Sequence, residues 1–212
     1  MKLQHLIYPI VAVALCAFPS RAQSPVQISV TPPESSIQTI DAQHPPAVPL
    51  EPGCSATTDI NFRLERSYAS TCPFKDETPG VSRVTLQITG VRLVTRLITI
   101  IYLPSGASAK LQAHEQGHKY IGEQCYKDAY RIAYYAASQV VGKQYAGAGT
   151  TFEAAKTDAA NKVTKEIEDF YVSRTLHLSM ALNGEYDRLT NHGKNQVPET
   201  QAIQQVFAAL KR

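Results

Sequence analysis

The change in hydrophobic period at Pro104 limits the possible folds of this chain more than any other feature. Before it, between residues 54 and 102, apolar residues alternate in short β-branched runs such as Ile60, Phe62 and Leu64. This is the period of half-buried strands. After it, apolar residues recur at spacings of three and four, as in amphipathic helices. Strands followed by helices predict an α+β fold, a small antiparallel sheet followed by two long helices.

Turn signals divide the first half of this pattern into three or four strands. Thr78-Pro79-Gly80 and Gly90 mark the expected turns, because Gly and Pro interrupt regular structure. Ser105 or Ser108 then caps a first long helix that runs to about Val140. A glycine-containing loop precedes a second helix that reaches about Leu182, with apolar residues at Phe152, Ala155, Ala159, Val163, Ile167 and Phe170.

Residues 1–22 have the pattern of an export signal. Lys2 precedes an apolar run, and Ser20-Arg21-Ala22 provides small residues at the −3 and −1 positions of a cleavage site. The run is shorter than the roughly 20 apolar residues that a transmembrane anchor needs. We therefore expect cleavage after Ala22, no membrane anchor afterwards, and an exported protein that is periplasmic or secreted.

Residues 23–53 contain seven prolines and few large apolar side chains. Such a segment buries too little surface to offset the entropy lost on ordering. It is expected to be a Pro-rich disordered or extended tether, either a plain linker or a removable pro-segment. The remaining residues, 54–212, form the predicted domain.

Charge and cysteine content limit the partners and the covalent links. Removing Lys2 and Arg21 with the signal from the 21 Lys and Arg residues leaves 19, against 18 Asp and Glu. This balance does not supply the clustered positive charge that nucleic-acid binding needs. Cys54, Cys72 and Cys125 remain after cleavage and allow at most one internal disulfide. Cys54 with Cys72 is the favoured pair, although the sequence leaves the pairing open.

The motif HEQGH, residues 114–118, carries the clearest chemistry in the chain. On a helix, His114 and His118 lie one turn apart on one face, where a single metal ion can bridge them. Glu115 flanks that face and is the candidate general base for a water activated by zinc. Gly117 costs about 1 kcal/mol in a helix interior, which suggests that another group approaches the backbone there.

A catalytic zinc usually has three protein ligands, so one more must come from elsewhere in the chain. His192 is the preferred candidate, because it lies in a polar loop and Gly193 lets the chain bend beside it. It would complete a three-histidine site. Asp187 and Glu166 remain alternatives, and Asp187 can instead orient a ligand imidazole through its ring N–H.

The sequence resembles a bacterial family described as predicted secreted Zn-dependent proteases. The resemblance rests on HEQGH after an apolar strand that ends in Leu-Pro, and on a downstream Tyr-Asp-x-x-Thr-x-His-Gly motif at residues 186–193. It implies a zincin-like metallopeptidase domain, zinc at His114 and His118, and Glu115 as base. It also implies functional roles for the motif residues Tyr186, Asp187, Thr190 and His192.

Tyr186 has two possible roles. Its phenol has the reach to stabilise a developing oxyanion, which would make it a catalytic residue with Glu115, or it is a packing aromatic at a helix end. The predicted function is that of a secreted zinc metallopeptidase of the HExxH type that hydrolyses a protein or peptide substrate. The alternatives are an exported zinc-binding protein without proteolytic activity and a zinc hydrolase of cell-wall amides.

Overall fold

One long strand, β4, organises the whole sheet. The computed structural model describes residues 24–209, and within them β4 pairs on one side with β3 alone, in antiparallel register. Along its other side β5, β1 and β2 follow one another, β5 antiparallel and β1 and β2 parallel. The strands are β1 (Val26–Val30), β2 (Glu34–Ile40), β3 (Thr57–Thr78), β4 (Val81–Pro104) and β5 (Gln144–Gly149).

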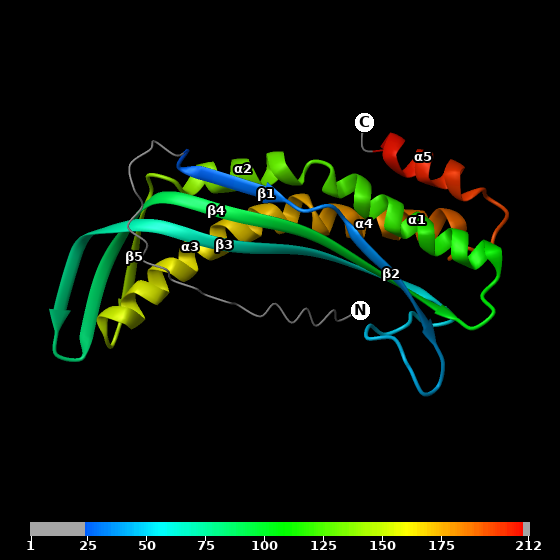
Figure 1. Cartoon of the computed structure of the whole chain (residues 1–212), viewed down its shortest axis with the longest axis horizontal. Helices are drawn as coiled ribbons and strands as arrows, with labels where there is room; N and C mark the ends of the chain where they lie inside the picture. The colour runs from blue at the N-terminus through cyan, green and yellow to red at the C-terminus, as the bar shows by residue number, and fades with distance from the viewer. Residues whose placement is uncertain (1–23, 210–212) are drawn as a thin grey trace.

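Helices cover one face of this sheet. Figure 1 shows α1, α4 and α5 gathered at one end of the molecule, and all three contact one another. The helices α2 and α3 pack on the middle of the sheet, and α3 extends to the other end, where it contacts β5. The helices are α1 (Ala109–Tyr126), α2 (Ala129–Val140), α3 (Phe152–Arg174), α4 (Leu176–Thr190) and α5 (Glu199–Ala209).

The core lies between β4 and the middle helices. Burial alternates along β4 except at Thr89 and Gly90 and at its last residues, so that side chains such as Leu93 and Leu97 are fully buried while their neighbours are more exposed. Leu93 packs in one cluster with Val163 and Ile167 of α3 and with the small residues of α2. Each such fully buried side chain contributes about 1.5–3 kcal/mol. The helical spacing predicted for residues 152–170 therefore marks a real buried face.

The predicted fold class is wrong. The chain has an α/β fold, with a five-stranded mixed sheet in place of a small antiparallel one and five helices within the described residues in place of two. The expected first helix is divided at Lys127 and Asp128, where Asp128 has a φ of −90° and a ψ of 5°, and the second is divided at Thr175, with a φ of −115° and a ψ of −73°. The expected Gly-rich loop contains β5, which pairs with β4. None of the helices in residues 24–209 is long and apolar enough to cross a membrane.

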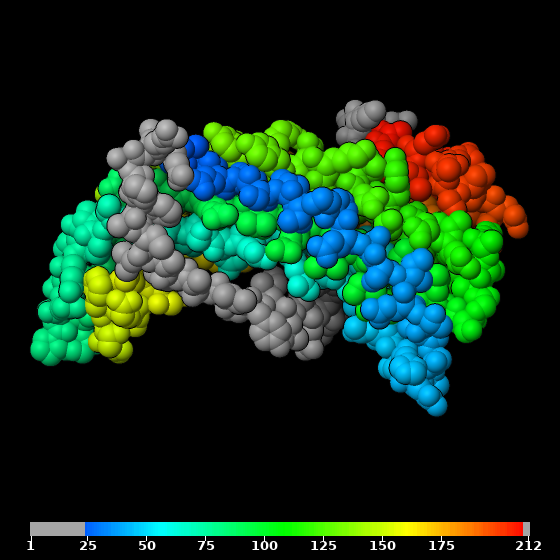
Figure 2. All heavy atoms as spheres, viewed as in Figure 1, coloured from blue at the N-terminus to red at the C-terminus, as the bar shows by residue number. Residues whose placement is uncertain are grey.

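The segment expected to be a disordered tether contributes two strands. Val26 and Ile40 are buried at the two ends of this β1–β2 segment, and the amide of Val91 donates to the carbonyl of Pro25 at 2.7 Å. Residues 41–56 then leave the sheet, and Figure 2 shows this segment projecting from the end of the molecule that carries α1. The signal predicted for residues 1–22 lies outside the described residues.

The turn predicted at Pro79-Gly80 is confirmed, and Gly80 has a φ of 81°. Gly90, the other expected turn, lies inside β4, where the pairing with β3 slips by one residue at Ala69 and Ser70. A second shift falls between Thr71 and Phe74. These bulges bend the hairpin without ending it, so two long strands replace the three or four that were expected.

The predicted Cys54–Cys72 disulfide is wrong, because all three described cysteines are free. Cys54 precedes β3, whereas Cys72 lies near the far end of that 22-residue strand. At about 3.3 Å per residue, their Cα atoms are tens of ångströms apart, far beyond the reach of a disulfide.

Candidate metal centre

The helix α1 presents the two motif histidines to one point. Its N-cap is Ser108, one of the two predicted caps, whose side chain accepts from the amide of Leu111 at 3.2 Å. His114 and His118 lie one turn apart, with their Nε2 atoms 3.2 Å apart. His114 is only 2% exposed. The expected bidentate geometry is therefore present inside the protein rather than on a solvated helix face.

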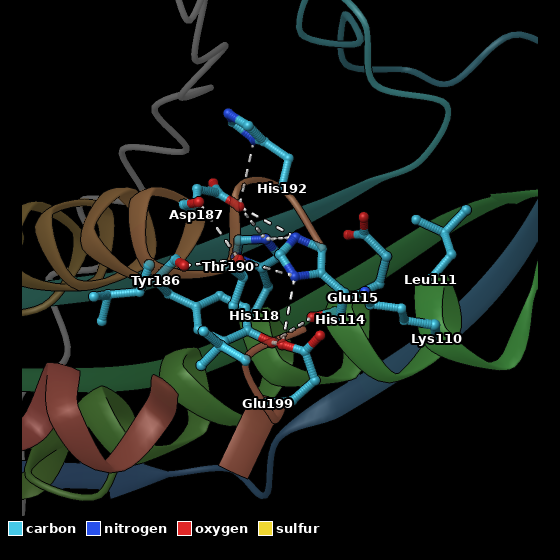
Figure 3. A network of polar contacts seen from close by, with 12 residues as sticks. Lys110, Leu111, His114, Glu115, His118, Tyr186, Asp187, Thr190, His192 and Glu199 are labelled. Atoms are coloured by element: carbon cyan, nitrogen blue, oxygen red, sulfur yellow. Dashed lines mark hydrogen bonds and ion pairs between the residues drawn. The ribbon is translucent and has the colours of Figure 1, made fainter. Parts of the chain in front are cut away.

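Asp187 from α4 completes a set of three donor atoms. Its Oδ1 lies 3.2 Å from Nε2 of His114 and 3.1 Å from Nε2 of His118. Zinc bonds of 2.0–2.1 Å in a tetrahedral site place neighbouring ligand atoms roughly 3.3–3.4 Å apart. The triangle needs an expansion of only a few tenths of an ångström to accept such an ion. Figure 3 shows the three side chains converging on one point.

The Asp187 carboxylate is suited to a cation. Oδ1 is buried and receives no hydrogen bond of acceptable geometry, although both imidazole nitrogens lie near it. Burial acts to raise the pKa of Asp187, but the two histidines outweigh it and hold the pKa well below its usual value. The Asp187 carboxylate is therefore ionised, and its Oδ1 has a lone pair that accepts no hydrogen bond from an N–H group. His114, His118 and Asp187 together form a possible metal-binding group.

A polar chain on α4 orients His118. Its Nδ1 lies 2.7 Å from Oδ1 of Asn183, whose Nδ2 donates to the carbonyl of Ser179 at 2.8 Å. Because the amide nitrogen is committed to Ser179, its oxygen faces the imidazole, so Nδ1 carries the proton and Nε2 presents its lone pair to a metal. Burial lowers the pKa of His118, but Asp187, Glu115 and Asn183 outweigh it and raise the pKa overall.

His114 has oxygen partners on its other ring nitrogen. Nδ1 lies 3.6 Å from Oε2 of Glu199 at the start of α5 and 3.5 Å from Oγ1 of Thr190. Thr190 donates its own proton to the carbonyl of Tyr186 at 2.8 Å, so its hydroxyl oxygen can accept from the imidazole. A carboxylate behind a ligand histidine fixes its tautomer and strengthens it as a donor.

Tyr186 packs against the two motif histidines, and its hydroxyl bonds to protein atoms. Its ring stacks on His114 with centroids 5.0 Å apart and meets His118 edge-on, also at 5.0 Å. The hydroxyl donates to Glu199 and lies 3.3 Å from the carbonyl oxygen of His114. A Cβ at Gly117 would lie 2.5 Å from Cζ of Tyr186. Tyr186 is thus the group whose approach to the backbone was expected at Gly117, and its phenol is held by protein atoms.

Glu115 is held beside the imidazoles by the edge of the sheet. It is 4% exposed, and its Oε2 accepts from the hydroxyl of Thr58 in β3 at 2.7 Å. The same hydroxyl also lies 3.2 Å from the carbonyl oxygen of Glu115. Figure 3 shows the carboxylate on the same side of α1 as the two imidazole rings. This is the placement that its predicted role as a base requires.

The other two ligand candidates are placed differently. Nδ1 of His192 lies 3.6 Å from Oδ1 of Asp187, but its ring belongs to a second donor group with Glu51 and Cys54. Glu166 lies on α3, where it pairs with the Lys143 ammonium at 2.6 Å and accepts from the hydroxyl of Tyr145 at 2.7 Å. Of the three candidates for the third ligand, the structure brings Asp187 into the triangle.

Sequence reasoning missed Asn183, Glu199 and Thr58. The polar residues before His192 predict a loop, whereas Tyr186 and Asp187 lie on α4. A helical reading of NGEYDRLT puts Asn183 one turn before Asp187, on the same face, and so would have found it. Glu199 and Thr58 come from segments with no local signal for this role.

Comparison of the chain with protein-family models, curated proteins and solved structures finds no match.

Proposed function

We propose that this protein is a zinc-dependent peptidase whose metal is held by His114, His118 and Asp187. The observation that carries the proposal is the placement of a buried glutamate, Glu115, beside three converging donor atoms. A nitrogen-rich set of three with one open position is typical of catalytic rather than structural zinc. The proposal also retains export of the chain, on the basis of the signal pattern in residues 1–22.

The protein residues have separate tasks in this proposal. When bound, zinc supplies Lewis acidity, which polarises a carbonyl group and lowers the pKa of water to about 7. Glu115 would accept a proton from the attacking water and would later deliver it to the leaving amine. Thr58 holds Oε2 of Glu115, so we assign the proton transfer to Oε1. Asn183 and Glu199 keep the imidazoles oriented.

A peptide substrate suits the sheet edge next to this site. Within the described residues β3 pairs only with β4, so its other edge is free along the segment that contains Thr58. An extended peptide can bind such an edge through main-chain hydrogen bonds. Because Thr58 touches Glu115, a peptide on this edge lies close to the proposed base. The resemblance of HEQGH and residues 186–193 to secreted Zn-dependent proteases supports the same substrate class.

Replacing Glu115 by Gln tests the catalytic part of the proposal. The amide keeps the shape of the side chain and removes the proton acceptor, so we expect bound zinc and the melting temperature to stay unchanged. Hydrolysis of a mixed peptide library, followed by mass spectrometry, should fall by about two to four orders of magnitude. Equal cleavage by the wild type and Glu115→Gln would refute the role of this residue.

Two outcomes lead to the alternative functions. A wild type that binds one zinc but cleaves no peptide and no cell-wall amide would be a zinc-binding protein without catalysis. Cleavage restricted to cell-wall amides would identify the other hydrolase class.

The choice of third ligand is tested by Asp187→Asn and His192→Ala. We expect the first variant to lose zinc at the helical site, because the amide oxygen is neutral, and the second to retain zinc there. The reverse result would restore the three-histidine site predicted from the sequence.

A further inference from the structure

We propose that Glu51, Cys54 and His192 form a second metal site, which binds a borderline-soft divalent ion such as zinc. Their ligand atoms, a carboxylate oxygen, a thiol sulfur and an imidazole nitrogen, all lie within 4.8 Å of one another. Nδ1 of His192 is 3.8 Å from Oε2 of Glu51. The inference does not depend on the peptidase proposal, since none of these residues belongs to the triangle.

Two tight turns from distant parts of the chain bring these donors together. In the first turn, the amide of Cys54 donates to the carbonyl of Glu51 at 3.0 Å. In the second, Asn191 and His192 both have positive φ values, 48° and 52°. Lys194 links the turns, because its Nζ donates to the carbonyl of Gly53 at 3.2 Å. The cluster is therefore part of a contact between segments rather than a chance meeting of mobile side chains.

The donor set selects the metal. Thiolate and imidazole ligands favour zinc and similar ions, whereas magnesium and calcium require a shell of oxygen atoms. Zinc–sulfur bonds of about 2.3 Å and zinc–nitrogen bonds of about 2.0 Å place sulfur and nitrogen roughly 3.5 Å apart, so atoms that lie within 4.8 Å of one another need to approach by about 1.3 Å at most. Cys54 is free for this role, since Cys72 lies near the other end of β3 and Cys125 is buried.

The second site adjoins the first. Nδ1 of His192 lies 3.6 Å from Oδ1 of Asp187, which faces both motif histidines. His192 thus stands between the two donor groups, and Figure 3 shows it above Asp187. A metal on Glu51, Cys54 and His192 would fix the segment 41–56 to the turn that follows α4. The protein would then bind two ions per chain.

Cobalt(II) separates the two sites, because a thiolate ligand gives a sulfur-to-cobalt charge-transfer band and the triangle contains no sulfur. Titration of the metal-free protein should give two equivalents of cobalt and this band. In Cys54→Ser we expect the band to disappear and one equivalent to remain. The control Cys72→Ser, at an exposed position far from the cluster, should keep both equivalents and the band.

A third variant, His118→Ala, removes a ligand of the triangle only, so it separates the test of the second site from the test of the proposed function. It should lose the sulfur-free equivalent and retain the band. Absence of the band in the wild type, or its persistence in Cys54→Ser, would overturn the second site while leaving the triangle untouched. Circular dichroism of each variant verifies that the fold is intact. Glu51→Gln, at an exposed position, is an independent change, and it should weaken the binding of the second equivalent of cobalt at least tenfold.

Discussion

Replacing Gly117 by Ala should destabilise the protein, although the same change usually stabilises a helix. Ala gains about 1 kcal/mol over Gly in a helix interior. Here the new Cβ would lie 2.5 Å from Cζ and 3.0 Å from Cε1 of Tyr186. Carbon atoms pack at about 3.5 Å or more, so the ring must move by about 1 Å. That ring is fully buried, stacks on His114 and donates to Glu199, so it has little freedom to move.

The cost of such overpacking is typically 1–3 kcal/mol, and the rigid surroundings place it near 3, which leaves a net loss of about 2 kcal/mol. For a chain of this size, the melting temperature should fall by about 4–8 °C. Gly184→Ala in α4 is the matched control, because nothing lies within 4 Å of the added Cβ, and it should raise the melting temperature by about 2–4 °C. Thermal unfolding of the metal-free proteins measures both changes. An increase for Gly117→Ala equal to that for Gly184→Ala would refute the reasoning.

Three further predictions concern separate parts of the structure. Asn183→Ala should weaken zinc binding about 10–100-fold, measured by competition with a chelator, because His118 loses its Nδ1 partner. Burial raises the pKa of Cys125 to about 11, so a thiol reagent at pH 8 should label the exposed Cys72 quickly and Cys125 only after unfolding; equal rates would contradict the burial. Ile167→Ala should cost about 2–5 kcal/mol in urea unfolding without changing zinc affinity, since it lies in the core away from the site.

The local part of the site could be predicted from sequence, and the part assembled by tertiary structure could not. His114, Glu115 and His118 are fixed relative to one another by one turn of helix, which the pattern HEQGH specifies. Asp187 reaches the same point only because α4 packs against α1. Polar residues and a glycine are usual in loops, so the sequence favours a loop for the segment around Gly184, whereas here the helical spacing of its polar residues forms a polar face toward α1.

The strands of the sheet also divide into those that the sequence pattern indicates and those that it does not. The alternation in residues 81–103 correctly indicated strands, because one face of β4 is buried and the period of two follows from that burial. β1 and β2 have no such signal, since they are held mainly by main-chain hydrogen bonds to β4 and bury only a few side chains. Pro32 and Pro33 lie between them and suggested disorder. Backbone pairing of this kind leaves no pattern in the side chains.

The two register shifts in the β3–β4 pairing have a consequence for the solubility of the chain. Within residues 24–209 β3 pairs along one edge only, and a long unpaired edge is a template on which another copy can add, which leads to aggregation. The shift between Thr71 and Phe74 inserts an extra residue into β3 and makes its edge irregular, and Pro73 within this bulge lacks an N–H donor. A bulge and a proline of this kind disfavour the addition of another strand to the outer half of the hairpin, so the longest regular stretch of this edge is the one that carries Thr58.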